Sequence, residues 1–217
     1  MTPRRDHAVV LARGFSSRMG RPKGLCRATS GGSTCLEAVA DLYRAAGLPL
    51  AVVTTPQLAR LYEPLLAGGA PVRWIVREAG QDTAASVAAA LTELAACATH
   101  LWLHPVDLPD VGAATLMRLS QASRLAPLAV LVPVHQGARG HPVVLPCAPF
   151  ADLRGSWPAG PMRDLLRERS ERGDARAVAV RELPVDDPGV ADDRDEPGPQ
   201  PAAAAPADGE VGKENRA

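Results

Sequence analysis

The N-terminal stretch VVLARGFSSRMGRPKGL, residues 9–25, combines three glycines with four basic side chains. Gly14 and Gly20 let the backbone approach a ligand closely, and exposed N–H groups in such a turn can form an anion-binding concavity. Arg18 and Lys23, one of only two lysines in the chain, add mobile positive charge that a triphosphate could neutralise. The spacing fits neither a Walker A loop nor G-x-G-x-x-G. The stretch predicts a polyphosphate site, with a solvated basic turn as the alternative.

The elements that would hold this turn are short apolar runs, which alternate with longer segments of helical periodicity. The expected strands are continuous apolar runs at 7–12, 48–54, 72–76, 100–104 and 128–134. The expected helices between them are 33–47, 56–69, 82–98 and 111–124. Further along, we expect a loop and strand at 137–146, a helix at 160–173 and a last strand at 175–183. The alternation predicts an α/β fold with a mostly parallel sheet, whose strand ends are the edge where such sheets bind ligands.

Composition and charge limit the class of protein. The 217 residues suffice for one domain, and 46% hydrophobic and 22% charged residues are ordinary for a globular protein. The formal net charge is zero, but residues 186–217 contain nine acidic and three basic side chains, so the preceding chain has a net charge of +6. This body could attract a small polyanion, but with only 3% aromatic residues it does not indicate a nucleic-acid partner. We expect a folded domain at 1–197 and a disordered Pro/Ala-rich tail at 198–217.

The sequence also indicates a compartment. No apolar run approaches the length of a membrane span, and residues 7–12 are too short for a signal-peptide core. The four cysteines, Cys26, Cys35, Cys97 and Cys147, have no metal-finger spacing, so free thiols are expected. We therefore expect a cytoplasmic protein without a membrane partner.

The basic turn has a counterpart in a known family. The string LARGFSSRMGRPKGL resembles the L-x-x-G-x-S-x-R-M-G-x-P-K signature of the MobA-like nucleotidyltransferases, in particular the molybdenum cofactor cytidylyltransferases. The matching residues are Leu11, Gly14, Ser16, Arg18, Met19, Gly20, Pro22 and Lys23. The resemblance implies a Rossmann-like, three-layer nucleotidyltransferase fold that binds a nucleoside triphosphate with Mg²⁺. It also implies that Arg18 and Lys23 hold the triphosphate, while Leu11, Ala12, Arg13, Gly14 and Ser16 line the nucleotide site.

Two further segments resemble motifs of the same family. LHPVDLPDV, residues 103–111, resembles its D-x-P metal motif, which implies that Asp107 binds Mg²⁺. A carboxylate at the end of a strand suits a hard cation that also bridges phosphates, and we assign Asp110 as the N-cap of the next helix. DTAASVAAAL, residues 82–91, resembles a segment whose serine lies near the nucleotide, which puts Ser86 there; helix capping or packing would explain Ser86 almost as well.

The last two resemblances concern the acceptor and the metal. In GARGHPVVLP, residues 137–146, Gly140, His141 and Pro142 match a family segment beside the acceptor or the nucleotide. We do not assign His141 as a general base. In DDRDEP, residues 192–197, Asp193 and Asp195 match a D-x-D-x-P stretch, so one of them could complete the metal site. Ordinary charges at the start of an acidic tail are the alternative.

Together these resemblances imply transfer of a nucleoside monophosphate to a phosphate-bearing acceptor, with release of pyrophosphate. Such chemistry depends on positioning and charge neutralisation more than on a protein nucleophile. The acceptor implied is molybdopterin or molybdenum cofactor, with a molybdoenzyme as a further partner, and Pro22 ahead of Lys23 favours CTP. A GTP-using or other small-phosphate transferase and a non-catalytic cofactor-binding chaperone are the alternatives. The departures from the family pattern are Arg13, in place of a small residue, and residues 156–163, which lack an acid-containing turn.

Overall fold

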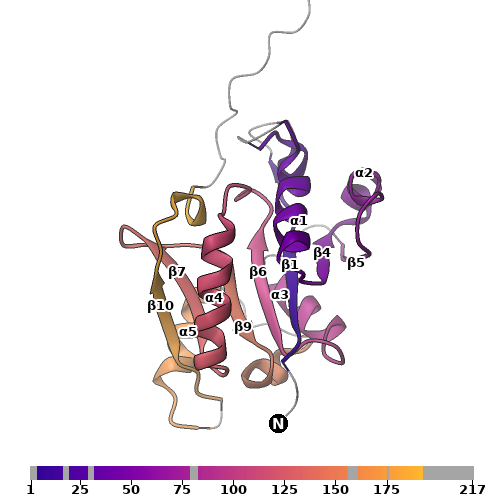
Figure 1. The fold of residues 1–217 in the computed structure, drawn as a ribbon. Helices are drawn as coiled ribbons and strands as arrows, with labels where there is room; N and C mark the ends of the chain where they lie inside the picture. Colours follow the sequence, from indigo (N-terminus) through magenta and orange to yellow (C-terminus); the bar gives the residue numbers. More distant parts are fainter. Residues whose placement is uncertain are drawn as a thin grey trace, which may run out of the picture.

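The computed structural model describes residues 4–16, 20–28, 32–78, 83–155, 161–174 and 176–192. Strands and helices alternate along most of this chain and form three layers, with the sheet in the middle (Figure 1). The α/β fold predicted from the sequence is confirmed. No helix in these ranges is long and apolar enough to cross a membrane.

The central sheet contains β1 (Asp6–Leu11), β4 (Leu50–Thr54), β5 (Val72–Val76), β6 (His100–Pro105), β7 (Val130–His135), β8 (Ala138–Arg139), β9 (Val143–Pro146) and β10 (Val180–Pro184). Its order is β10-β7-β9-β6-β1-β4-β5, and the short β8 pairs with β7. β9 is antiparallel to both of its neighbours, whereas the other pairs along this order are parallel. The prediction of a mostly parallel sheet is therefore confirmed.

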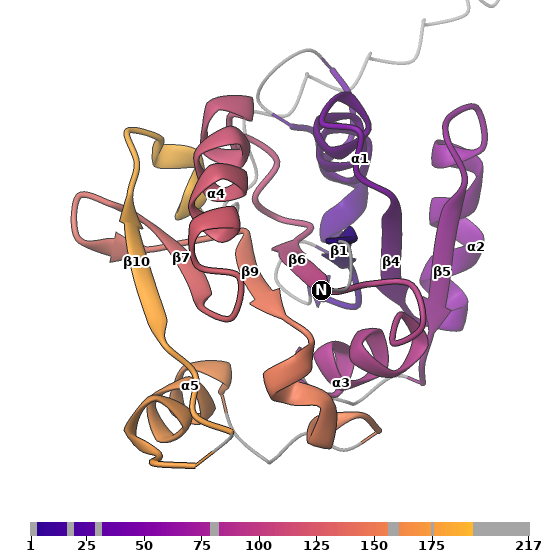
Figure 2. The same ribbon diagram turned by 60° about the horizontal axis from the view of Figure 1, so that its bottom comes forward.

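Helices cover both faces of the sheet (Figure 2). On one face lie α1 (Cys35–Ala45), α2 (Pro56–Leu66) and α4 (Ala113–Leu125), and on the other lie α3 (Thr83–Glu93), the 3-10 segment η2 (Ala148–Leu153) and α5 (Met162–Glu171). Alternate residues of β1 point to opposite faces of the sheet. Val10 packs in the hydrophobic core under α1, α2 and α4, and Val9 packs in the core under α3, η2 and α5. Strands covered in this way must be apolar on both sides, which is why they appear in the sequence as continuous apolar runs.

Local chemistry explains where the helices begin. α1 begins with a capping box, in which Thr34 Oγ1 accepts from the Glu37 N–H and the Glu37 carboxylate accepts from the Thr34 N–H. The assignment of Asp110 as the cap of α4 was wrong. The N-cap is Gly112, and the carboxylate that accepts from its N–H, at 2.8 Å, belongs to Asp187, 75 residues later in the chain.

The glycine-rich turn contains secondary structure of its own, between the first strand and the first helix. It forms a short antiparallel hairpin of β2 (Phe15–Ser16) and β3 (Arg21–Pro22), followed by the 3-10 turn η1 (Lys23–Leu25). Gly20 has φ +63, a left-handed conformation that favours glycine. The turn thus presents Lys23 on a separate short element ahead of α1.

One edge of the sheet gathers the motifs. In the parallel pair of β1 and β6, Leu11 is opposite Pro105, so both strands end at this edge. In the antiparallel pair of β6 and β9, Leu103 is opposite Val143, so β9 begins there. The residues that follow β1, follow β6 and precede β9 are therefore neighbours in space, although they are far apart in the sequence.

Candidate active site

Lys23 and Asp107 form an ion pair at this edge. Lys23 Nζ lies 2.5 Å from Asp107 Oδ2, and the two side chains are only 19% and 15% exposed. The pair joins η1 to the turn after β6 across 84 positions of sequence. The structure thus brings together the residue predicted to bind the triphosphate and the residue predicted to bind the metal.

Lys23 is held in place by close packing of the residue after it. A Cβ at Gly24 would lie 2.8 Å from ring atoms of Tyr62, so only glycine fits without movement of that ring. Tyr62 belongs to α2 and is fully buried. The Cys26 N–H donates to the Lys23 carbonyl at 3.0 Å and closes the turn. The Lys23 backbone is therefore fixed against α2, while its side chain faces Asp107.

A buried hydrogen-bond chain supports the turn that contains Asp107. His104 Nε2 lies 2.8 Å from the Leu108 carbonyl, and His104 Nδ1 lies 2.9 Å from the Tyr43 hydroxyl. Because a carbonyl only accepts, Nε2 bears the proton and Nδ1 accepts from the tyrosine. Burial lowers the pKa of His104 to about 4, so the ring is neutral at neutral pH. The Val106 N–H also donates to the Leu11 carbonyl, which ties the turn to β1.

Arg13 and Ser86, both predicted to line the nucleotide site, are in direct contact. Arg13 Nη1 donates to Ser86 Oγ at 3.0 Å, and Arg13 Nη2 donates to the carbonyl of Glu78. The arginine therefore spans the space between the end of β1 and the first turns of α3. The Ser86 side chain is almost completely buried. This contact gives Arg13, the departure from the family pattern, a structural role in addition to any contact with a ligand.

The backbone groups of Leu11 and Ala12 are already hydrogen-bonded within the protein, whereas Gly14 is exposed. The Ala12 N–H donates to the Val53 carbonyl at 2.9 Å, and the Ala12 carbonyl accepts from Thr54 Oγ1 at 3.0 Å. The Leu11 carbonyl accepts from Val106. Gly14, in contrast, is exposed, and no described atom lies within 4 Å of the position of a Cβ on it. Of these three residues, Gly14 has the backbone most open to a ligand.

Gly140, His141 and Pro142 reach the same edge from the other side. The His141 N–H donates to the Val190 carbonyl at 2.8 Å, and a Cβ on Gly140 would lie 2.2 Å from that same oxygen. His141 Nδ1 is 3.3 Å from the Leu103 carbonyl, and the peptide bond to Pro142 is cis. Burial lowers the pKa of His141, while the negative charge of Asp107 partly opposes that shift. The field of Asp107 therefore extends to this third motif.

A short C-terminal turn, η3 (Pro188–Val190), braces two of these segments and was missed in the sequence. Its Asp187 cap binds the start of α4, and a Cβ on Gly189 would lie 2.3 Å from the Asp110 carbonyl oxygen. Its Val190 binds His141. The string Asp-Asp-Pro-Gly at 186–189 is a turn signal that could have located it. The described chain then ends at Asp192, whose N–H donates to the Pro188 carbonyl of this turn.

Several predicted residues fall outside the described chain. Arg18, Asp193 and Asp195 do so entirely, as does the tail from 198 onward, and the side chain of Ser16 is not described. Within the described ranges, no group of three or more His, Cys, Asp or Glu side chains could hold a metal ion. Mg²⁺ in phosphate-transfer sites commonly uses one or two carboxylates together with substrate phosphates. The single Asp107 carboxylate fits an ion that binds in that way.

Known proteins are similar to this chain along most of its length. The profile of the MobA-like NTP transferase domain matches residues 8–174. The structure is similar to Rv0371c from Mycobacterium tuberculosis H37Rv, with 29% identity, 85% of this chain and 90% of that chain covered, and a TM-score of 0.67. A manganese complex of Rv0371c matches with 27% identity, 85% and 89% coverage and a TM-score of 0.64.

More distant structures share the fold. Molybdopterin-guanine dinucleotide biosynthesis protein A from Archaeoglobus fulgidus has 18% identity, 82% of this chain and 83% of that chain covered, and a TM-score of 0.55. The 4-diphosphocytidyl-2C-methyl-D-erythritol synthase from Anaerococcus prevotii DSM 20548 has 14% identity, 82% and 89% coverage and a TM-score of 0.63. A search of curated protein sequences found no match. Since the family profile spans most of the chain and the family's motifs meet at one edge of the sheet, this chain belongs to the MobA-like NTP transferase family.

Proposed function

We propose that the protein transfers a nucleoside monophosphate, with CTP as the first-choice donor, to the terminal phosphate of a molybdopterin-type acceptor and releases pyrophosphate. The observation that supports this most directly is the 2.5 Å contact between Lys23 and Asp107. Between them, these side chains supply the two kinds of charge that a metal–triphosphate complex requires, a cation for the phosphates and a carboxylate for the metal. Both face the strand edge where ligands bind in open α/β sheets.

The bond changes follow from the chemistry of phosphates. An oxygen of the acceptor phosphate attacks the α-phosphorus, the bond from that phosphorus to the bridging oxygen breaks, and pyrophosphate leaves with the electron pair. A phosphate monoester has a second pKa of about 6, so at pH 7 the acceptor is already largely dianionic and needs no protein base. This agrees with leaving His141, whose buried ring is kept neutral, without a role in proton transfer.

The protein then has two tasks, to position the two substrates and to neutralise the negative charge of the phosphates. Lys23 exchanges Asp107 for the β- and γ-phosphates, where negative charge grows as pyrophosphate leaves, and Arg18 assists it. Asp107, with Asp193 or Asp195 as a second ligand, would hold Mg²⁺, which supplies charge neutralisation on the phosphates when bound. The exposed Gly14 backbone would meet the nucleotide, and Arg13 with Ser86 would form the wall beside it.

The choice of CTP and of a molybdopterin-type acceptor follows from the family resemblance. Pro22 before Lys23 resembles the cytidylyltransferases, while the distant structures include one named for a diphosphocytidyl product and one named for a molybdopterin-guanine product. A cofactor-binding chaperone without turnover is the second candidate. The observation that favours it is the Arg13 contact, because it occupies the hydroxyl of Ser86 that the family resemblance assigns to the nucleotide.

The test is release of pyrophosphate from CTP, GTP, ATP and UTP with Mg²⁺ and purified molybdopterin, for the wild type and for Asp107→Asn. We expect release with CTP, and we expect the variant to fold but to lose turnover together with its dependence on Mg²⁺ concentration. Release of pyrophosphate with GTP instead of CTP would indicate that the protein is a guanylyltransferase. Molybdopterin binding without release from any NTP would support the chaperone and refute transfer.

A further inference from the structure

The short turn η3 lies between two of the motifs that meet at the strand edge. After β10 the chain passes the N-terminal end of α4 and forms this turn beside it (Figure 1). A Cβ on Gly189 would overlap the Asp110 carbonyl and lie 2.9 Å from the Val111 nitrogen, so the two backbones are in direct contact there. Both contacted residues stand between Asp107 and the start of α4. η3 therefore packs against the segment that presents the proposed metal ligand.

The other end of η3 contacts residues 140–142, the segment that the family resemblance places beside the acceptor or the nucleotide. The Val190 carbonyl accepts from the His141 N–H at 2.8 Å, and a Cβ on Gly140 would overlap that same carbonyl. The Val190 side chain is fully buried. Glycine at 140 and at 189 lets the backbone of η3 approach both segments closely. One short turn thus touches two motifs that are far apart in the sequence.

Asp187 holds η3 in this position with three hydrogen bonds to its carboxylate. Oδ2 accepts from the Gly112 N–H at 2.8 Å and from Thr115 Oγ1 at 2.6 Å, and Oδ1 accepts from the Gly189 N–H at 3.0 Å. Hydrogen bonds to an ionised group are stronger than neutral ones. The Asp187 N–H also donates to His135 Nδ1, at the end of β7, at 3.2 Å. One residue therefore ties η3 to the first turn of α4 and to the sheet.

The separation of the two motifs matters for the proposed reaction. The acceptor phosphate must meet the α-phosphorus in a fixed geometry, and a misplacement of about 1 Å can cost about 10²-fold in rate even when it arises far from the chemistry. Asp107 follows β6 and residues 140–142 precede β9, so both lie beyond the last pair of these strands, Leu103 with Val143. Beyond that pair η3 contacts both segments, so their separation depends on where η3 is held.

We infer that Asp187 is a positioning residue, which through η3 holds the turn that carries Asp107 and residues 140–142 at one fixed separation. The inference rests on the proposed function and deepens it, because it names the element that sets the distance between the metal and the acceptor. Asp187 acts through the backbone of Gly189 and Val190 rather than on a substrate. A simple helix cap is the competing role, and it would affect the start of α4 alone.

The first arm of the test separates these roles by hydrogen–deuterium exchange in the full-length protein without ligands. In Asp187→Ala, the loss of three hydrogen bonds should raise exchange roughly tenfold at 106–111 and at 139–141 as well as at 112–116. Asp187→Asn, whose amide oxygen can still accept, should stay close to the wild type. Gly189→Ala retains the carboxylate but pushes η3 away from the Asp107 turn, so it should raise exchange at 106–111 and leave 112–116 protected.

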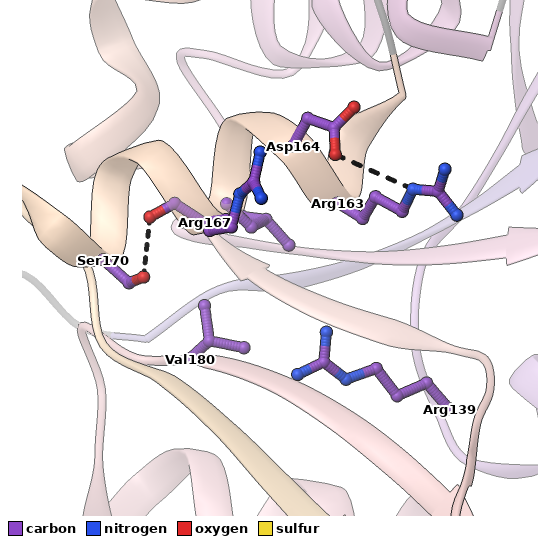
Figure 3. Close-up of a pocket in the computed structure, with 7 residues that line it drawn as sticks. Arg139, Arg163, Asp164, Arg167, Ser170 and Val180 are labelled. Carbon is purple, nitrogen blue, oxygen red and sulfur yellow. Dashed lines mark hydrogen bonds and ion pairs between the residues drawn. The ribbon is translucent and has the colours of Figure 1, made fainter.

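Arg139→Gln is the matched control. Arg139 precedes Gly140 in the chain and pairs with Glu182 at 2.6 Å, but both side chains are largely exposed, so the pair contributes little stability. Figure 3 shows the Arg139 side chain opposite α5 and near Val180, whereas η3 packs in the core on the α4 face. The control should therefore leave exchange unchanged in the Asp107 turn and in η3.

The second arm measures pyrophosphate release from CTP with molybdopterin, at a temperature where circular dichroism shows every variant folded. In Asp187→Ala and in Gly189→Ala, kcat should fall roughly ten- to hundredfold while KM for CTP stays within about twofold. Asp187→Asn and Arg139→Gln should turn over at nearly the wild-type rate.

Increased exchange confined to 112–116 would show that Asp187 only caps α4 and would overturn the inference. Wild-type kcat in Asp187→Ala, with increased exchange in both segments, would overturn it as well, because the separation would then not matter for transfer. If exchange rises in both segments but even the wild type releases no pyrophosphate, the link through η3 is supported and the transfer reaction is refuted.

Discussion

Replacing Lys23 by methionine should raise the affinity of the nucleotide-free protein for a divalent metal. In the structure the Asp107 carboxylate is already occupied by the Lys23 ammonium at 2.5 Å, so a metal ion that approaches alone must displace this cation. Methionine keeps the length and the apolar stem of lysine but removes its charge. A triphosphate would have the same effect in the wild type, because it offers Lys23 another anion and thereby releases the carboxylate.

The size of the effect follows from the burial of the pair. Fully exposed ion pairs contribute about 0.2–1 kcal/mol, whereas breaking a buried pair costs about 3–5 kcal/mol. With side chains that are 19% and 15% exposed, the Lys23–Asp107 pair lies between these cases, so we take about 2 kcal/mol. That free energy corresponds to a roughly 30-fold change in metal affinity. The same factor should appear as positive cooperativity between NTP and metal in the wild type.

The assay is the free Mn²⁺ signal in electron paramagnetic resonance, with and without CTP. Lys23→Met should bind Mn²⁺ more tightly than the wild type when no nucleotide is present, and CTP should increase that affinity by a smaller factor than in the wild type, because only its phosphate ligands then contribute. Arg172→Met is the control, since it removes a cation from the exposed carboxylates of Glu168 and Asp174. An Mn²⁺ affinity in Lys23→Met that equals or falls below the wild-type value would refute the competition between lysine and metal.

Three further outcomes are expected. Asp187→Ala should lower the free energy of unfolding in urea by about 0.5–2 kcal/mol through loss of the carboxylate that accepts from the Gly112 N–H, and Asp187→Asn, whose amide oxygen can still accept, should cost clearly less; equal losses would contradict the capping role of Asp187. Burial holds the pKa of folded His104 near 4, below the unfolded value of about 6.5, so the unfolded state binds the proton first and stability should fall by about 3 kcal/mol from pH 6.5 to 4. A His104→Asn variant should show a flatter pH profile of unfolding free energy, and an identical slope would count against the buried neutral ring. Removal of residues 198–217 should leave the Tm and the activity nearly unchanged, and a large drop in Tm would show that the tail packs on the domain.

The sequence predicted the fold because its signals are local. Continuous apolar runs arise where a strand is covered on both faces, and the expected strand at 72–76 coincides with β5. The antiparallel direction of β9 could not be predicted in this way, because direction depends on the path of the preceding loop through Gly140. The prediction of the α4 cap was wrong for a related reason. Asp110 is the carboxylate nearest to the start of α4 in the sequence, but the carboxylate that accepts from the Gly112 N–H is that of Asp187.

The site was partly predictable for the same reasons. Lys23 and Asp107 belong to short motifs at the ends of β1 and β6, and parallel strands end at a common edge, so their proximity follows once the sheet is predicted. The partners that fix them could not be found. Tyr43 and His104 are 61 residues apart, and nothing in either neighbourhood indicates that a hydroxyl and an imidazole meet. The contact of Arg13 with Ser86 could not be found either, because the two residues are 73 positions apart.

The charges at the edge make Lys23 the counter-ion of the proposed metal ligand, Asp107. Burial keeps His104 and His141 neutral, so neither ring supplies a positive charge to Asp107 at neutral pH. In the described chain Lys23 is the cation that pairs with this carboxylate, and the pair is neutral as a whole. On the proposed mechanism, a triphosphate, which is more negative than a single divalent ion can offset, would draw Lys23 away while the metal takes its place on Asp107. Such an exchange of counter-ions, with little change in net charge, would let the proposed site bind the metal only when the nucleotide is present to bind the lysine.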